Sequence, residues 1–291
     1  MIYVIVGPTG VGKTKLSVAL AKKLNAEIIN ADSMQVYQGL DIGTAKIREE
    51  EKEGIPHHLF DIVDVSKTYT VYDYQKDARE KIEEIISRGK NVIMVGGTGL
   101  YIRACLYDYQ FQEETTQESF EEMSNEELLK QIYTYTDQVS VHPNNRKRLI
   151  RLLNRYKNGE TEIEKKSEPL YDFYMIGLTT DRKALYEKID SRVDQMIEDG
   201  LLEEVEALYK QNIYSKAIQT GIGYKELYRY FEGNCTKEEA ISEIKKNSRH
   251  YAKRQYTFFN HQFSVHWFET DYVNFQRTID EVLESINREC D

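Results

Sequence analysis

Eight residues near the N-terminus have the types and the spacing of a phosphate-binding loop. The run matches the pattern G-x-x-x-x-G-K-[ST] in full, and its members are Gly7, Pro8, Thr9, Gly10, Val11, Gly12, Lys13 and Thr14. Glycines let the backbone wrap closely around an anion, and successive N–H groups and a helix N-terminus supply partial positive charge. Lys13 adds a full charge, and the hydroxyl of Thr14 is placed to bind Mg²⁺. The sequence therefore predicts a site for a phosphate group.

The strand that should hold the metal in a nucleotide hydrolase has an unusual end. Such enzymes place an acidic residue there, but the apolar run NVIMV (residues 91–95) is followed by Gly96, Gly97, Thr98 and Gly99. The small residues and the Thr98 hydroxyl suit a close approach to an oxygen of a bound phosphate. A turn with a capping threonine is the alternative.

A carboxylate follows a different strand. Asp32, Ser33 and Gln35 come directly after the apolar run AEIIN (residues 26–30). In an open α/β sheet, ligands bind at the carboxyl ends of the strands. Asp32 could act there as a base or a metal partner, and Gln35 could read an amide or amine edge. An Asp-Ser helix cap and turn would explain the same residues. The adjacent pair His57 and His58 is not expected to share a metal or to act in catalysis.

Apolar strands alternate with amphipathic helices over the first hundred residues, and again near the C-terminus. This spacing is typical of βαβ units and predicts an α/β protein with a doubly wound parallel sheet. Between residues 112 and 170 the sequence is helical and charge-rich, without a convincing strand. We therefore expect a core domain made of residues 1–111 and 171–291, interrupted by a helical insertion domain at residues 112–170.

The charge distribution leaves open whether the protein binds a polyanion such as a nucleic acid. The net charge is −10, which disfavours binding to nucleic acid. Two segments are nevertheless basic, NRKRLIRLLNRYK (residues 145–157) and KKNSRHYAKRQ (residues 245–255), so a polyanion could dock on them. Solvated helix faces are the alternative. The sequence lacks a run of about eighteen apolar residues and an evident leader, and its three cysteines are widely spaced. We expect a cytoplasmic monomer without membrane contact.

Eight ordered stretches together resemble the tRNA dimethylallyltransferases, also called tRNA isopentenyltransferases. They run from residue 7 to about residue 259 and read GPTGVGKT, DSMQVYQGLDIGTAK, GIPHHLFD, VGGTGLY, HPNNRKRLIR, GLLEEVEAL, GIGYKEL and AKRQYTFF. The phosphate loop alone would be weak evidence, but eight stretches in family order are specific. One difference is Thr220, which stands where some relatives have Arg or Gln; Gln219 is its neighbour.

The resemblance implies a P-loop NTPase-like fold and a transfer reaction. The phosphate loop would hold dimethylallyl diphosphate, and the dimethylallyl group would pass to N6 of the adenosine just 3′ of the anticodon in tRNA. By analogy Asp32 would take the proton from N6, and Thr98 would bond the diphosphate at the leaving oxygen. Lys13, Thr14 and Mg²⁺ would neutralise charge on the leaving group.

The resemblance also implies two surfaces for the anticodon stem-loop. The target base would be flipped into a channel lined by Asp32, Ser33, Met34 and Gln35. The helical insertion would contact the RNA backbone through Arg146, Lys147, Arg148, Leu149, Ile150 and Arg151.

Three other functions use some of the same features. An ATP-dependent small-molecule kinase would use the phosphate loop and the carboxylate. Against it, this chain has no acidic residue at the end of the strand at residues 91–95. An adenylate isopentenyltransferase would act on free AMP or ADP with the same active-site motifs. An RNA-binding module without chemistry would leave Asp32 and Thr98 unexplained.

Overall fold

The computed structural model describes residues 1–109, 111, 118–139, 141–159 and 168–290 of the chain. These residues form two compact units. The first contains Met1–Asp108 and Glu168–Asp291, and the second contains Tyr109–Ser167. The boundary expected at residue 112 lies outside the described residues, and the other boundary falls three residues before the expected residue 170.

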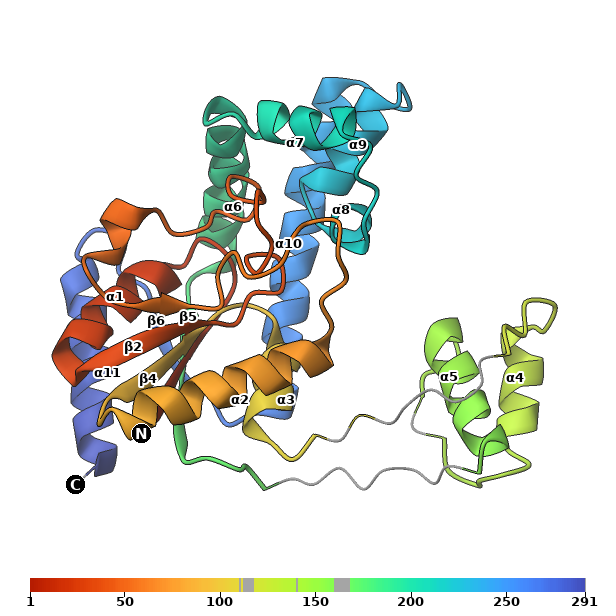
Figure 1. Cartoon of the computed structure of the whole chain (residues 1–291), viewed down its shortest axis with the longest axis horizontal. Helices are drawn as coiled ribbons and strands as arrows, with labels where there is room; N and C mark the ends of the chain where they lie inside the picture. The colour runs from red at the N-terminus through yellow and green to blue at the C-terminus, as the bar shows by residue number, and fades with distance from the viewer. Residues whose placement is uncertain (110, 112–117, 140, 160–167, 291) are drawn as a thin grey trace. The chain divides into compact units, whose positions relative to one another are not determined.

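Within the described residues, six strands form one parallel sheet in the first unit, in the order β3-β2-β4-β1-β5-β6 (Figure 1). The strands are β1 (Ile2–Val6), β2 (Ala26–Asn30), β3 (His57–His58), β4 (Asn91–Val95), β5 (Phe173–Thr179) and β6 (His266–Glu269). In the centre, Tyr3 of β1 lies between Ile93 of β4 and Tyr174 of β5. The predicted α/β fold with a parallel sheet is confirmed.

Helices cover both faces of the sheet. In this unit they are α1 (Lys13–Leu24), α2 (Val71–Ser87), α3 (Gly99–Leu106), α6 (Arg182–Glu198), α7 (Leu201–Lys210), α8 (Lys216–Thr220), α9 (Tyr224–Phe231), α10 (Lys237–Gln262) and α11 (Phe275–Cys290), with a short 3₁₀ helix at Glu49–Lys52. Successive residues of β1 point to opposite faces. Tyr3 and Ile5 pack with α1 and α11, whereas Ile2 and Val4 pack with α2 and α3. The sheet is thus doubly wound.

A group of helices stands beyond the carboxyl ends of the strands. α6 and α10 run from the sheet to α7, α8 and α9 (Figure 1). Their shared core includes Leu201, Val205 and Leu227, and it takes in Val36 and Leu40 from the loop that follows β2. The loop that carries the candidate residues is therefore packed against this group of helices.

The second unit is a helical pair, α4 (Asn125–Ile132) and α5 (Arg146–Lys157), with a small core of its own. Leu128 and Ile132 of α4 pack on Leu149 and Leu153 of α5. Across both units, none of the described helices has the length and apolar character needed to cross a lipid bilayer.

A buried carboxylate joins β2, β3 and the start of β4. The Glu27 side chain is only 4% exposed, and it accepts hydrogen bonds from His58 Nε2 (2.7 Å), Arg88 (2.7 Å) and Lys90 (2.8 Å). His57 instead bonds the carbonyl of Ile55, so the two histidines have separate partners. Burial alone would raise the pKa of Glu27, but the bonds from Lys90, His58 and Arg88 outweigh it and lower that pKa to about 2.

We expect Glu27→Gln to destabilise the protein at neutral pH and to reduce its loss of stability in acid. A carboxyl pKa lowered from its unfolded value contributes stability that is complete above the unfolded pKa and is lost as pH falls through the folded pKa. The window here runs from about pH 4.5 down to about pH 2. Arg88 and Lys90 keep about a third of their side-chain surface in water, and water weakens their attraction to Glu27. We therefore expect Glu27→Gln to lower the free energy of unfolding at neutral pH by about 2 kcal/mol, measured by urea unfolding at several pH values.

Glu84→Gln is the matched control for this prediction. Glu84 also pairs with Arg88, but its side chain is 46% exposed, so its loss should change stability little at any pH. Equal unfolding curves for the two variants would show that the buried carboxylate has no special contribution.

Candidate active site

The phosphate loop connects β1 to α1 in the expected way. Gly7 has φ of 137°, and a Cβ there would lie 2.5 Å from the carbonyl oxygen of Leu178, so the loop approaches β5 too closely for a side chain. α1 starts at Lys13 after Gly12, and no side chain among the described residues caps it. Its first N–H groups are thus available to an anion.

The ends of β2 and β4 are tied together by the Thr98 hydroxyl. Thr98 Oγ1 accepts a hydrogen bond from the Ser33 backbone N–H at 3.0 Å and donates one to Ser33 Oγ at 3.2 Å. The Thr98 N–H donates to the carbonyl of Ala31 at 3.1 Å. The adjacent Asp32 carboxylate accepts the N–H of Met34 at 2.9 Å. Residues that follow two neighbouring strands therefore meet at one point of the sheet edge, where ligands bind in open α/β sheets.

Lys13 and Asp32 interact electrostatically, and burial shifts the pKa of each side chain. Burial and repulsion from Arg192 lower the pKa of Lys13 to about 7, against the attraction of Asp32. Burial also raises the pKa of the Asp32 carboxyl, although the Met34 N–H, Lys13 and Arg192 oppose the rise. A carboxylate with a raised proton affinity is a better base than one in water. Lys13 Nζ itself donates to the carbonyl of Pro8 at 2.7 Å.

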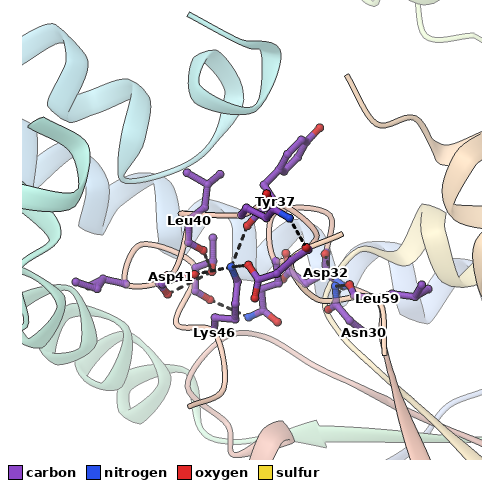
Figure 2. Close-up of polar contacts among 12 residues, drawn as sticks. Asn30, Asp32, Tyr37, Leu40, Asp41, Lys46 and Leu59 are labelled. Atoms are coloured by element: carbon purple, nitrogen blue, oxygen red, sulfur yellow. Dashed lines mark hydrogen bonds and ion pairs between the residues drawn. The ribbon is translucent and has the colours of Figure 1, made fainter. Parts of the chain in front are cut away.

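The loop after Asp32 is held by polar contacts with its own neighbours. Figure 2 shows the Asn30 side-chain amide bonding the carbonyls of Asp32 and Leu59, each at 3.0 Å. It also shows the buried Lys46 ammonium, which donates to the Tyr37 carbonyl at 2.9 Å and pairs with Asp41. The side chain of Lys46 is 7% exposed, so it acts as an internal tie of the loop.

Two further ties fix the loop from outside and from within. The Glu204 carboxylate of α7 accepts the backbone N–H groups of Asp41, Ile42 and Gly43 at 2.7 to 3.1 Å. Gln35 Nε2 donates to the carbonyl of Thr44 at 2.9 Å. The amide nitrogen of Gln35, a residue predicted to read an amide or amine edge, therefore also supports the loop.

Two residues of α10 for which no role was predicted reach this edge. Gln255 Nε2 donates to the carbonyl of Gly97 at 3.0 Å, and the Tyr251 hydroxyl donates to the same oxygen at 3.3 Å. Burial, followed by the charge of Asp32, raises the pKa of Tyr251 to about 12. Both residues lie in the basic segment 245–255. Because most residues of this segment are charged, its sequence does not indicate that Tyr251 and Gln255 face inward.

Arg192 of α6 is the other residue that sequence reasoning missed. It interacts electrostatically with Lys13 and Asp32, and burial lowers its pKa. Its position in the sequence could have identified it. Arg192 lies seven residues after the buried Leu185 and next to the buried Val193, near the apolar face of the helix. An arginine near the apolar face of an amphipathic helix is an exception to the pattern.

The predicted basic segment of the second unit divides into internal and external residues. The Arg146 guanidinium donates to the carbonyls of Phe120 (2.7 Å) and Met123, so it holds the chain before α4. Leu149 is fully buried, and Ile150 packs against the same core. The outward-facing cations of the predicted set are Lys147, Arg148 and Arg151.

Thr220 and Gln219 bond within their own segment. Thr220 Oγ1 donates to the carbonyl of Lys216 at 2.7 Å, and Gln219 Nε2 donates to the carbonyl of Tyr214 at 3.2 Å. The turn after them is close to the candidate site, since a Cβ on Gly221 would lie 2.6 Å from the Met34 side chain.

Comparison with known proteins assigns the chain to a family. Residues 35–262 match the family model described as IPP transferase. The chain belongs to the IPP transferase family. The tRNA dimethylallyltransferase of Anoxybacillus flavithermus is 50% identical over 98% of this chain and 96% of its own length.

Two solved structures resemble this chain. The tRNA isopentenylpyrophosphate transferase of Bacillus halodurans has a TM-score of 0.79 and 43% identity, over 98% of this chain and 95% of its own. A eukaryotic dimethylallyltransferase acting on tRNA has a TM-score of 0.72 and 30% identity, over 91% of this chain and 73% of its own. The family model starts after Asp32, whereas the Anoxybacillus flavithermus and Bacillus halodurans proteins each match 98% of this chain.

Proposed function

We propose that this protein transfers a dimethylallyl group from dimethylallyl diphosphate to N6 of the adenosine 3′ of the anticodon in tRNA. Membership of a transferase family whose relatives are named for this activity supports the reaction. The observation that carries the proposal within the chain is the meeting of Asp32 and Thr98 at adjoining strand ends, with the electrostatic coupling of Asp32 to Lys13 of the phosphate loop.

In the proposed reaction, a bond from N6 to C1 of the dimethylallyl group forms while the bond from C1 to oxygen breaks. The electron pair of the broken bond stays with the diphosphate, and the N6 proton passes to Asp32. Burial of Asp32 supports this role because it favours proton uptake. Ser33, Met34 and Gln35 would flank the flipped adenine, with Met34 backed by the α8–α9 turn.

The diphosphate would occupy the loop from Gly7 to Thr14. The N–H groups at the start of α1 and the Lys13 ammonium would bind its oxygens, and so would the Thr98 hydroxyl, whose proton would turn from Ser33 Oγ to the diphosphate. Mg²⁺ often takes few protein ligands and completes its coordination shell with phosphate oxygens and water. A single exposed hydroxyl such as that of Thr14 is compatible with this mode of binding. The described residues contain no cluster of three acidic, His or Cys side chains for a metal. When bound, Mg²⁺ would supply charge neutralisation of the leaving group.

The exposed face of α5 would contact the tRNA backbone. Lys147 and Arg151 are four residues apart and share this face with Arg148, opposite the buried leucines. The inward contacts of Arg146 and Leu149 argue for a supporting role, so we restrict the proposed phosphate contacts to these three cations. We also propose that the protein acts as a cytoplasmic monomer.

We expect the double variant Lys147→Ala/Arg148→Ala to bind an anticodon stem-loop less tightly and with less salt dependence. Each lost phosphate contact removes a term of roughly 0.7 to 0.9 from the slope of log affinity against log salt, so the slope should fall by roughly 1.5. Filter binding over a range of NaCl concentrations measures this. Lys130→Ala, an exposed cation on α4, is the control and should leave the slope unchanged. A slope unaffected in the double variant would remove these residues from the interface.

A transfer assay tests the function directly. Radiolabelled dimethylallyl diphosphate and Mg²⁺ would be incubated with the protein and with either an anticodon stem-loop containing A-A-A or free AMP. Label in the stem-loop supports the proposal. Label in AMP but not in RNA would indicate an adenylate isopentenyltransferase, and ATP consumption without transfer would indicate a kinase.

A further inference from the structure

We propose that the segment between β6 and α11, residues 270–275, sets the conformation of the phosphate loop and so directs its N–H groups toward the anion. Thr270 and Tyr272 are the positioning residues of this segment, because each donates a side-chain hydrogen bond to a carbonyl of the loop. Both would act through the loop rather than by touching the substrate. The inference rests on the proposed function for the identity of the anion, a diphosphate.

Two successive carbonyls of the phosphate loop accept hydrogen bonds from this segment. Thr270 Oγ1 donates to the carbonyl of Val11 at 3.0 Å, and the Tyr272 hydroxyl donates to the carbonyl of Gly10 at 3.4 Å. Thr270 is only 5% exposed, so water cannot readily replace its hydroxyl. Because a buried carbonyl that loses its donor is costly, the bond from Thr270 favours one orientation of the peptide unit that follows Val11.

The directions of these carbonyls determine the directions of the N–H groups. In a trans peptide unit, the C=O of one residue and the N–H of the next point in opposite directions. The Gly10 and Val11 carbonyls point to the segment, so the N–H groups of Val11 and Gly12 point to the opposite side of the loop. The Gly12 carbonyl accepts the Leu16 N–H at 3.0 Å in the first turn of α1, so the Lys13 N–H points out of the helix start. Successive N–H groups gathered in this way form an anion-binding concavity.

Gly12, the next residue of the loop, is held by packing instead of a hydrogen bond to the segment. It has φ of 90°, and a Cβ on it would lie 2.5 Å from the ring of Phe275. This ring is 8% exposed, and Lys15 Nζ lies over it, 4.8 Å from its centroid. The ring therefore fills the space beside Gly12 and prevents the loop from moving toward α11.

The segment is itself fixed to the sheet and to α11. The Thr270 N–H donates to the carbonyl of Thr179 at 2.9 Å, directly after the pairing of β5 with β6. The Asp271 N–H donates to Thr278 Oγ1 at 2.9 Å, and the Asp271 carboxylate accepts the N–H of Asn274 at 2.8 Å. The donors to the phosphate loop are thus in place before an anion arrives, so binding does not have to order the loop.

A preformed loop would act on the diphosphate both when it binds and when it leaves. The electron pair of the broken bond from C1 to oxygen stays with the diphosphate, and N–H groups already in position stabilise that charge without reorganisation. Since the diphosphate is strongly charged before the reaction as well, most of the effect should be on binding. Loss of the positioning bonds should therefore raise KM for dimethylallyl diphosphate more than it lowers kcat.

The test is calorimetric titration of the full-length chain with inorganic diphosphate, without tRNA and at one fixed Mg²⁺ concentration. Thr270→Val keeps the shape of the side chain but removes the donor, and we expect it to weaken binding roughly 5- to 20-fold, the effect of one buried hydrogen bond. Thr270→Ser keeps the hydroxyl and should bind within about twofold of wild type. Tyr272→Phe should weaken binding by a smaller factor, about threefold, because its bond is longer.

Tyr174→Phe is the control for a general loss of stability. Tyr174 is 6% exposed and belongs to the same core cluster as Val11, and its hydroxyl bonds Ser285 Oγ at 2.8 Å, away from the phosphate loop. It should lower the melting temperature about as much as Thr270→Val does, but it should bind diphosphate as wild type does. Equal weakening of diphosphate binding by these two variants would overturn the inference.

Transfer kinetics and unfolding complete the test. In Thr270→Val, KM for dimethylallyl diphosphate should rise by the same factor as the dissociation constant of diphosphate, while KM for the stem-loop stays within about twofold. A diphosphate affinity of folded Thr270→Val within twofold of wild type overturns the inference. If this variant does not fold, Tyr272→Phe decides, and wild-type affinity in it has the same meaning. Thr270-dependent diphosphate binding without transfer to RNA supports the inference and overturns the proposed function instead.

Discussion

Replacing Asp32 with asparagine is expected to lower kcat for dimethylallyl transfer by roughly 10²- to 10⁴-fold, the usual effect of losing a general base. The amide has nearly the same shape, and its oxygen can still accept the Met34 N–H that Asp32 accepts at 2.9 Å. It cannot take the N6 proton. Single-turnover transfer from dimethylallyl diphosphate to an anticodon stem-loop measures the chemical step without product release.

Asp41→Asn is the control for this prediction. Asp41 is a carboxylate of the same loop, but its side chain is 61% exposed and pairs with Lys46. Its loss should change the single-turnover rate only a few-fold. Stem-loop affinity measured in parallel should be close to wild type for both variants. A rate for Asp32→Asn within tenfold of wild type would assign the proton transfer to another group or to water.

Gly96→Ala should destabilise the protein by more than about 3 kcal/mol, beyond the range of ordinary surface changes. A Cβ on Gly96 would lie 2.2 Å from the carbonyl carbon of Ala31 and 2.3 Å from its oxygen. Both are backbone atoms of a fully buried residue, so no side-chain rotation relieves the overlap. The same carbonyl accepts the Thr98 N–H, so the positions of Thr98 and of the neighbouring candidate site would be distorted as well. Urea unfolding measures the loss.

Gly89→Ala separates this steric effect from the loss of glycine itself. Gly89 has φ of 71° and no atom within 4 Å of an added Cβ, so only the left-handed backbone is penalised, by about 1 kcal/mol. If the two variants unfold at the same urea concentration, the close approach of β2 and β4 is not a constraint on the fold.

The sequence was most informative about continuous apolar strands. Runs such as AEIIN and NVIMV predicted strands, and their alternation with helices was enough to infer a parallel sheet. β3 could not be predicted, because it has only two residues, His57 and His58, and its pairing with β2 depends on tertiary structure. Predictions at the strand ends rested on a general property of α/β sheets, so Asp32 and Thr98 could each be assigned to the carboxyl edge of the sheet from sequence.

Side chains that arrive from distant segments could not be predicted. Gln255 bonds Gly97 across 158 positions of sequence, and no local pattern marks such a contact. Residue type was equally uninformative within α5. Arg146 and Arg148 are both arginines of one basic run, but the position of each on the helix turns the first toward backbone carbonyls and the second outward.

The points where the chain leaves and re-enters the α/β unit lie side by side. Tyr107 pairs with Pro169, and the Leu170 N–H donates to the carbonyl of Leu106 at 2.8 Å. Ends held together in this way make the intervening segment resemble one long loop, whose closure entropy rises only slowly with length. The α/β unit should therefore tolerate replacement of the whole helical pair by a short Gly-Ser linker. Its folding would then be independent of the helical pair, the part of the chain that we propose contacts the tRNA backbone.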